Sequence, residues 1–527
     1  MPRRILLLTS LILVSALAAE AGEKEVRDFR FVRDVTPALQ LSNPAALGRW
    51  TGQLSCVTLT GAKGNGALVP LEGSGNDFSI SAGTESFYRM SDRLTFHGKL
   101  SWSDFQGQGM GGPALIAPEL HPVSFLESDP TTTGPRKREL YGLSGALALD
   151  LGPRWALGLG ADYTAGDQTK VKDPRFTSVL MDLDIAAGVT FRPSDALLLG
   201  LSLHYRDMME QLRGAVYGVN DTQYFIWTDK GAFLGSSAGL VGDMAYVSTQ
   251  NLRPMADRYF GLSLQALVRE RLSNELSVRY RTGYYGKKAS SSPVFFECAG
   301  MEAAYKGVLV IPSGFRMQRI SLDLGVTVLG NDENVFRYVT PPGQSTVVEY
   351  GGQNHVLDRV DVNAVLDYRW YGEVAGTRPG ETLGARIAFA ARRQTSNQYP
   401  VWRRQAVNTL SLDLFGQKVW MRGPLSFVLD LALCAQAGFG TEKEDGSYAP
   451  GASSGVKSFD EYLGRYYEYK TLPRAGASAG FTLARRFPAG FEIYLGVSDE
   501  YVQLLSEARW LGGQYHNLAC ITLGCNF

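Results

Sequence analysis

The chain has 527 residues, and its 52 basic and 52 acidic side chains leave no formal net charge. This balance argues against a broad nucleic-acid-binding surface, which would need a basic excess. The five cysteines cannot all pair and are scattered along the chain, so we expect no disulfide framework.

The chain begins with the pattern of a secretory signal peptide. Arg3 and Arg4 give a positive start, residues 5–17 are almost continuously apolar, and small residues follow up to Ala21. We therefore predict that residues 1–21 are a removed signal peptide. The first cysteine is Cys56, so no acyl anchor is expected at the cleavage site. No later stretch of about 18 apolar residues predicts a transmembrane helix.

Strict alternation of apolar and polar residues is the dominant pattern after this point. In residues 179–191 every odd position is apolar, whereas Asp182, Asp184 and Thr190 lie between them. A strand places these two sets on opposite faces, but a helix would mix them. About 18 such segments follow Thr51, with a range of 14 to 18.

The connections between these segments alternate in length. Short polar turns are predicted at positions such as 273–274 and 423–424. Long loops are predicted at residues 106–138, 207–258, 330–356 and 438–474. The sequence therefore predicts an all-β, transmembrane, antiparallel β-barrel over residues 51–527, with short periplasmic turns and long external loops. A soluble sandwich gives less reason for this order of lengths. Residues 22–50 are predicted to be a short periplasmic or lumen segment.

The last strand resembles the assembly signal of Gram-negative outer-membrane proteins. Alternate residues from Tyr515 to Cys525 share one face, which ends at the terminal Phe527. The resemblance implies integral placement in outer-membrane lipid and recognition by the barrel-assembly machinery.

Two further resemblances concern the N-terminal segment and the whole chain. Residues 42–47 (Ser-Asn-Pro-Ala-Ala-Leu) are similar to the Asn-Pro-Ala stretch of fatty-acid-transporter-like barrels, in which it forms a small hatch inside the lumen. The alternative is an ordinary turn in which Asn43 caps a helical start. The overall pattern looks most like a Bacteroidetes-type outer-membrane β-barrel family of unknown function.

Charged residues take the strand face opposite the apolar one and are predicted to line the lumen. They are Lys99, Asp182, Asp184, Arg279, Arg281, Arg319, Asp323, Arg359, Asp361, Asp367, Arg386, Arg392, Asp413 and Asp430. They either set the selectivity of a solute path or simply pair across strands in a polar barrel interior.

Aromatic residues near strand ends are typical of the girdles at the two membrane interfaces. We assign Trp102, Trp155, Tyr205, Trp370, Trp420 and Phe527 to these girdles. The loop residues Tyr462, Tyr466, Tyr467 and Tyr469 could alternatively stack on sugars.

The sequence gives no sign of an enzyme and predicts no cofactor or metal. Residues 451–455 have the spelling of a nucleophile elbow but lack a preceding strand and a following helix. A membrane-embedded lipid hydrolase, the remote alternative, would need a Ser–His pair on the outer barrel surface near the membrane boundary. His97 and His516 are the candidate histidines, and no serine is singled out as their partner. TonB-dependent transporters carry a plug of well over a hundred residues before the first strand, and only about 30 residues precede it here.

The preferred function is that of a passive pore or channel-like transporter for small or amphipathic solutes. The first alternative is a non-conducting surface-binding or structural barrel whose long loops bind a partner or a glycan. The sequence adds one criterion: a lumen blocked by the N-terminal segment or by folded-in loops would favour binding over free passage.

Overall fold

The computed structural model describes residues 27–127, 129–218, 222–240, 246–289, 292–449 and 457–527. The predicted signal peptide lies outside the described residues. Eighteen strands form the main sheet: β1 (Gln53–Asn65), β2 (Asn76–Arg89), β3 (Leu94–Met110), β5 (Gly134–Asp150), β6 (Trp155–Lys170), β7 (Arg175–Ser194), β8 (Leu197–Ala215), β11 (Arg253–Val268), β12 (Leu272–Ala289), β13 (Ser292–Ser313), β14 (Arg316–Val339), β15 (Val347–Gly372), β16 (Glu381–Gln398), β17 (Val401–Arg422), β18 (Leu425–Ser447), β20 (Arg474–Phe487), β21 (Phe491–Leu504) and β22 (Tyr515–Asn526).

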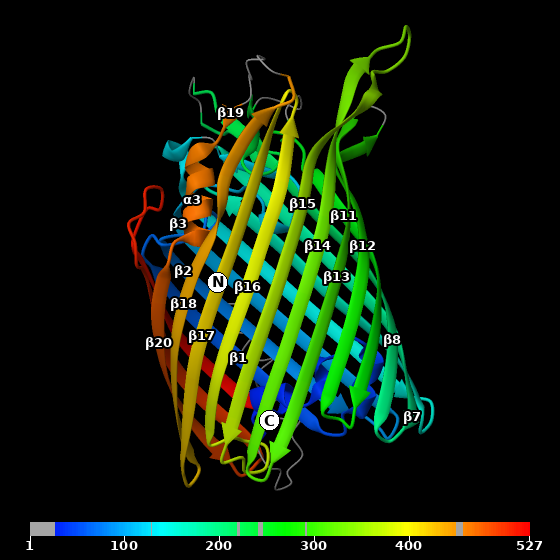
Figure 1. Cartoon of the computed structure of the whole chain (residues 1–527), viewed down its shortest axis with the longest axis vertical. Coiled ribbons are helices and arrows are strands. Elements are labelled where there is room, and N and C mark those ends of the chain that lie inside the picture. Colours follow the sequence, from blue (N-terminus) through cyan, green and yellow to red (C-terminus); the bar gives the residue numbers. More distant parts are fainter. Residues whose placement is uncertain (1–26, 128, 219–221, 241–245, 290–291, 450–456) are drawn as a thin grey trace.

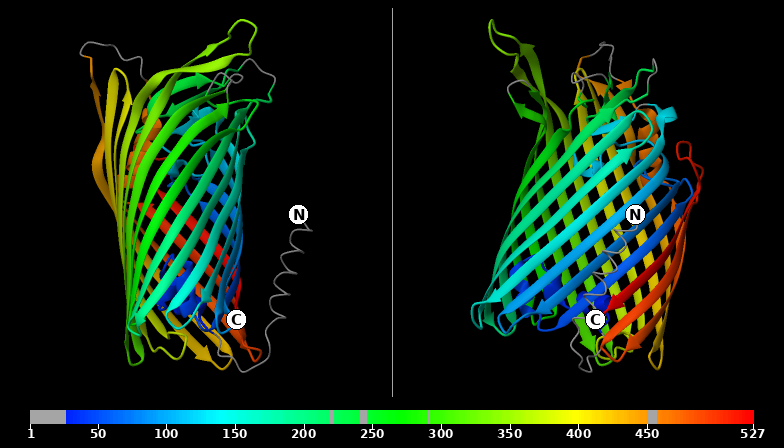
Figure 2. Two further views of the ribbon diagram at one scale, coloured as in Figure 1. Left: turned by 90° about the vertical axis from the view of Figure 1, so that its right-hand side faces the viewer. Right: turned by 180° about the vertical axis from the view of Figure 1, so that it is seen from behind.

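These strands pair antiparallel in chain order and close into a barrel (Figures 1 and 2). Closure is made by β1 and β22, which pair from Cys56 opposite Asn526 to Asn65 opposite Asn517. The terminal Phe527 continues this pairing, because its backbone N–H and C=O both bond to Ser55. A closed barrel leaves no strand edge unpaired, which is the condition for a sheet in lipid. The predicted fold class and the predicted 18 strands are confirmed.

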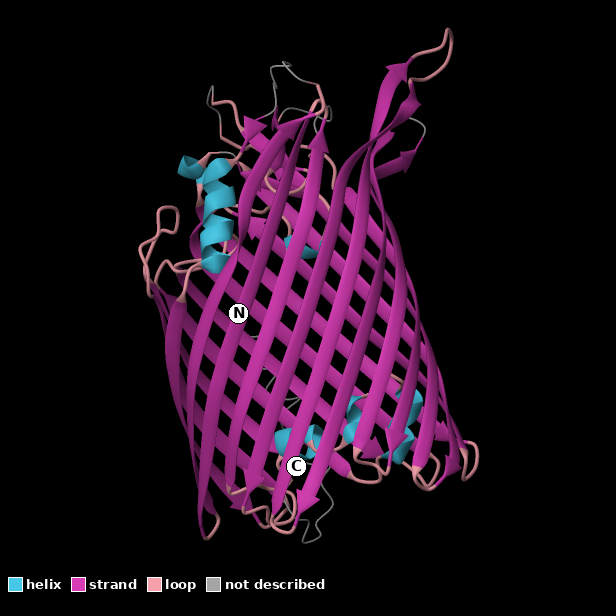
Figure 3. Cartoon of the chain, viewed as in Figure 1, coloured by secondary structure: helices cyan, strands magenta, loops and turns pink. Residues whose placement is uncertain are grey.

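The remaining elements lie at the two ends of the barrel. They are α2 (Phe29–Asp34), η1 (Pro37–Gln40), η2 (Pro44–Arg49), η3 (Pro118–Leu120), β4 (Ser124–Glu127), η4 (Pro130–Thr132), β9 (Phe225–Asp229), β10 (Leu234–Gly239), β19 (Lys457–Ser458) and α3 (Asp460–Thr471). Short turns and α2, η1 and η2 gather at one end, and the long loops with α3 gather at the other (Figure 3). We call these ends periplasmic and external, following the asymmetry of outer-membrane barrels.

The outer face of the barrel is apolar, as lipid requires. Leu159, Leu203 and Leu433 are each about 60% exposed (64%, 59% and 59%), which a water-soluble sheet would not sustain across a whole face. Trp155 and Trp420 lie at strand ends and are also about half exposed. Cys520 and Cys525 lie on opposite faces of β22, and all five thiols are free, as expected from their spacing.

Several predicted connections differ from the structure, because the loops predicted at 106–138 and 207–258 also contain β4, β9, β10 and the ends of barrel strands. The turn expected at 273–274 lies at 269–271, where Arg269 and Glu270 adopt positive φ values of 50° and 58°. Residues 330–356 are mostly strand, and only 340–346 connect β14 to β15. There the pairing extends beyond the lipid, so nothing imposes an apolar face and the alternation fades. The stretch 438–474 is only partly loop, because it holds the end of β18 and helix α3. Among the described residues, no helix is long and apolar enough to cross a membrane.

Candidate functional site: the lumen and the two segments that occupy it

The N-terminal segment, residues 27–50, folds inside the periplasmic end of the barrel (Figure 3). Asp28 caps the N-terminus of helix α2, because its side chain accepts a hydrogen bond from the Phe31 backbone N–H at 2.9 Å. Burial raises the pKa of this aspartate. Phe29, Phe31 and Trp50 belong to a buried cluster with Leu54, Phe87, Ala148 and Tyr371 of the wall. Burial of this apolar surface fixes the segment against β1, β2, β5 and β15.

The Ser-Asn-Pro-Ala turn sits in a seat formed by glycines of the barrel wall. The Asn43 amide donates to the side chain of Gln265 at 3.1 Å, and the same side chain caps η2 by accepting from Ala45 N–H. Gly158 on β6 and Gly188 on β7 face each other across the strand pair under this turn. A Cβ on Gly158 would overlap the Ala45 backbone, and one on Gly188 would overlap the Asn43 side chain. The capping role and the lumen position, offered as alternatives by the sequence, therefore occur together.

Polar contacts attach the same segment to strands β12, β14 and β15 of the wall. The Asp34 carboxylate pairs with Arg369, and its backbone carbonyl accepts from Arg319 Nε at 3.0 Å. Ser42 donates to Glu275 of β12 through both its backbone N–H, at 2.8 Å, and its hydroxyl. Ion pairs and hydrogen bonds of this kind, unlike a continuous apolar interface, can be exchanged for water at modest cost.

The external loops fold into the other end of the lumen and form a cap. Strands β4, β9, β10 and β19 make a four-stranded sheet, and α3 lies beside it. One apolar cluster joins Phe125 and Ile226 of the cap to Tyr285 and Phe296 of the wall, and a second joins Trp227 to Tyr462. The hydroxyl of Tyr462 accepts from Gly112 N–H at 3.0 Å. Tyr462 is therefore part of the core of the cap, where a surface sugar could not stack on it.

A buried cluster of charges fastens the cap to the wall at His121. His121 Nε2 lies 2.9 Å from Glu210 Oε2, and its Nδ1 lies 3.5 Å from Asp257 Oδ2, with all three side chains at most 1% exposed. Asp257 also binds Arg281 at 2.9 Å. Burial alone would lower the pKa of His121, but hydrogen bonds with Asp257 and Glu210 outweigh it and raise this pKa. Both ring nitrogens face carboxylates, so the imidazolium fits this position best.

Other buried charges hold the cap together and to the wall. Glu127 of β4 binds Arg136 at 2.7 Å and Lys170 at 2.5 Å, and Lys230 binds Glu333 of β14 at 2.7 Å. Burial raises the pKa of Asp229 in β9 to about 6. These contacts make the external closure a mixture of apolar packing and ionic attachment.

Most of the predicted lumen residues form ion pairs with other residues of the barrel wall, on the same strand, on a neighbouring strand or on a strand further along the sheet. Asp182 binds Arg206 at 2.7 Å, and Asp184 binds Arg279 at 3.0 Å. Arg281 binds Asp257, and Arg319 binds Asp367 at 2.9 Å. Asp361 binds both Arg359 at 3.1 Å and Arg392 at 2.6 Å. Arg392 also reaches Glu119 of the cap. The register places Lys99 opposite Glu85, Asp323 opposite Lys306 and Arg386 opposite Asp413, and Asp430 accepts from Gln417 at 2.8 Å.

Two residues considered for a lipid hydrolase lie on the wrong face for that role. His97 binds Glu85 at 3.1 Å and stacks on Phe87, which packs against the N-terminal segment inside the lumen. His516 lies one position from the outward-facing Tyr515 and Asn517, and therefore also points inward. Residues 451–455 lie outside the described residues. Among those described, no group of three metal-ligating side chains is arranged to hold a metal ion.

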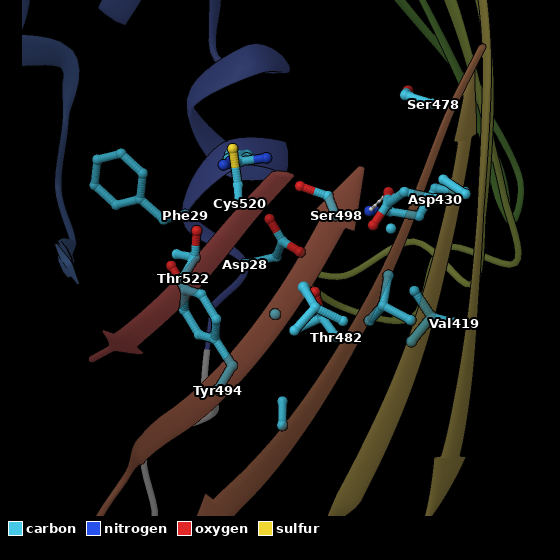
Figure 4. Close-up of a pocket in the computed structure, with 18 of the residues that line it drawn as sticks. Asp28, Phe29, Val419, Asp430, Ser478, Thr482, Tyr494, Ser498, Cys520 and Thr522 are labelled. Atoms are coloured by element: carbon cyan, nitrogen blue, oxygen red, sulfur yellow. Dashed lines mark hydrogen bonds between the residues drawn. The ribbon is translucent and has the colours of Figure 1, made fainter. Parts of the chain in front are cut away.

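A cavity remains beside the N-terminal segment. It has a volume of about 450 Å³ and lies between residues 28–30 and the inner faces of β17, β18, β20, β21 and β22. Figure 4 shows Thr482, Ser498 and Thr522 on three of these strands, around Asp28 of the segment. Asp430 of this cavity is one of the predicted lumen residues. The hydroxyl residues were not predicted, because serine and threonine in a lumen-facing position give no distinctive pattern.

These features define an outer-membrane-type β-barrel whose lumen holds its own N-terminal segment and external loops. The chain belongs to the DUF6850 family, described as a family of unknown function, whose model matches residues 44–527. This match confirms the expected kind of family, while the Bacteroidetes origin stays a prediction. No curated protein matches the chain in sequence.

The solved structures that the chain resembles include three receptors for ferric ligands. The ferric preacinetobactin receptor BauA of Acinetobacter baumannii has a TM-score of 0.40 and 8% identity, over 90% of this chain and 80% of that one. The ferric-catecholate import receptor Fiu of E. coli K12 has a TM-score of 0.38 and 9% identity, over 89% and 81%. A ferric enterobactin receptor PfeA of Pseudomonas aeruginosa has a TM-score of 0.40 and 9% identity, over 91% of this chain and 82% of that one.

Proposed function

We propose that this barrel carries small polar solutes across the outer membrane through a lumen that its own N-terminal segment and external loops close at rest. The observation that carries the proposal is the polar attachment of residues 27–50 to the wall, at Asp34 and Ser42 above all. A passive pore that is always open needs a continuous water path, and the N-terminal segment and the external cap narrow that path at both ends of the lumen. Displacement of the segment would widen it.

Solute-driven swelling of proteoliposomes tests this proposal. The unmodified mature chain should swell slowly, and a variant lacking residues 27–50 should swell many times faster. Heat-modifiable mobility in gels serves as the control that the shortened chain still closes its barrel. Equally fast swelling of both proteins would support a permanently open pore and contradict gating. No swelling of either would contradict transport.

One observation favours the alternative of a surface-binding barrel. The hairpin of β14 and β15 projects well beyond the external rim (Figure 1), and its residues Tyr338 and Tyr350 are exposed. An arm of this kind suits contact with a partner or a glycan. In the swelling assay, this function corresponds to the outcome in which neither protein admits solute.

We also propose, from the paired end of β22 at Phe527, that the barrel-assembly machinery recognises this last strand.

A further inference from the structure

The two halves of the periplasmic lumen differ in chemistry. The N-terminal segment is bonded to Glu275, Arg319 and Arg369, on the half of the wall that carries the paired charges. The 450 Å³ cavity lies against the other half, β17 to β22, whose inner face bears hydroxyls and small residues together with the carboxylates of Asp430, Glu492 and Glu500. The space left open by the segment is therefore lined by hydroxyls and by more acidic than basic side chains.

The wall of the cavity offers hydrogen bonds of both senses. The hydroxyls of Ser478, Thr482, Ser498 and Thr522 can each donate and accept, and these residues lie on three consecutive strands. Glycines at 480 and 496 lie between them and leave the backbone open to close approach. This surface matches a ligand that itself carries many hydroxyl groups.

Larger groups at the rim of the cavity complete this chemistry. Asp28, Asp430, Glu492 and Glu500 supply carboxylate acceptors, and Arg30 and Arg378 supply donors. The ring of Tyr494 gives a flat face beside Thr522 (Figure 4). Because acidic side chains outnumber basic ones in this lining, an anion meets repulsion, whereas a neutral polyol does not.

We propose that this cavity is a binding site for uncharged polyhydroxylated solutes, namely sugars or similar polyols. The inference deepens the proposed function and rests on it for the direction of travel, but binding in the cavity is a separate property. The volume lies within the range of roughly 300–1,000 Å³ that small-molecule sites occupy.

A native thiol provides the test. Cys520 lines the cavity, whereas Cys525 lies on the opposite, outward face of the same strand. A membrane-impermeant methanethiosulfonate reagent is applied to the intact mature chain, and peptide mass spectrometry follows the labelling of each cysteine. Glucose should slow the labelling of Cys520 several-fold and leave that of Cys525 unchanged. Gluconate, which has the same carbon skeleton with a negative charge added, should protect Cys520 much less.

A conservative pair of variants separates recognition from simple blockage. Thr482→Val removes a hydroxyl of the cavity at nearly constant shape and should reduce the protection by glucose several-fold. Thr84→Val, on the outward face of β2, should leave it unchanged. Absence of protection by glucose, or equal protection by gluconate, would overturn the proposed site.

The two proposals fail in distinguishable ways. Protection of Cys520 without faster swelling of the variant lacking residues 27–50 supports the sugar site and contradicts gated transport. Faster swelling without protection supports gated transport and overturns the sugar site.

Discussion

At the scale of single residues, His121 is the clearest link between the external cap and the barrel wall. It lies between Glu210 and Asp257, and Glu210 also accepts from the Ile116 backbone N–H. Arg281 and the Cys298 thiol contact Asp257 from the wall, and Arg359 donates to the His121 carbonyl at 3.1 Å. The residue therefore joins one loop to strands β8, β11 and β15.

This geometry predicts a cap that loosens at alkaline pH. The pKa of His121 is raised in the folded cap. The stabilisation that the protonated imidazole gives to the folded cap is therefore complete below the ordinary pKa of about 6.5, and it is lost as pH rises through the raised pKa. Within that window the opening equilibrium of residues 111–127 should increase by up to about tenfold per pH unit. Hydrogen exchange of these amides, followed by mass spectrometry, measures the change.

The control for this prediction is His121→Gln, which cannot carry the proton. This variant should exchange faster at all pH values and lose the pH dependence. An unchanged pH dependence in His121→Gln would show that another group is responsible.

At the scale of elements, the seat of the N-terminal segment depends on glycine at chosen wall positions. Gly158 and Gly160 both face the lumen on β6, two residues apart, yet only Gly158 touches the backbone of the segment too closely for a Cβ. A Cβ on Gly160 would lie 3.5 Å from Pro44 Cβ, which is an ordinary contact. An added methyl group at Gly158 and one at Gly160 therefore serve as a matched test and control.

We expect Gly158→Ala to displace the N-terminal segment and Gly160→Ala to leave it in place. Overpacking of this kind costs about 1–3 kcal/mol, which corresponds to roughly 5- to 150-fold in the equilibrium between seated and released forms. Hydrogen exchange of residues 43–50 should accelerate accordingly in the first variant. Equal exchange in the two variants would mean that the turn is not held by this close fit.

Local patterns explain which elements could be predicted. Lipid imposes an apolar outer face, so alternation such as that of residues 179–191 identified the membrane-crossing strands and their number. The turn at Arg269 and Glu270 was misplaced because neither residue is a usual turn former at positive φ. Helix α3 was missed because it is stabilised by its surroundings: Glu468 accepts backbone N–H groups of residues 509–511 at 2.8 to 3.0 Å.

The contents of the lumen are harder to predict, because they depend on contacts between residues far apart in the chain. The seat of Asn43 combines Gly158 and Gly188 with Gln265, more than a hundred residues away. One signal was available: Val294, Phe295 and Phe296 are consecutive apolar residues and are all at most 5% exposed. A run of this kind breaks the alternation where the cap covers the inner face of a strand.

At the scale of the whole molecule, an 18-stranded barrel has room for a channel, and this chain fills much of that room with its own residues. Apolar clusters and buried ion pairs hold the external cap, whereas the N-terminal segment combines one apolar cluster with exchangeable polar contacts. This difference makes the periplasmic segment the element that moves more easily. The cavity beside it then lies on the route that its displacement would widen.

The most direct test of a lumen closed at rest is single-channel recording of the unmodified, refolded mature chain in a planar bilayer. A lumen closed at rest should give long closed periods interrupted by brief stepwise openings. A large, steady conductance from the moment of insertion would contradict it.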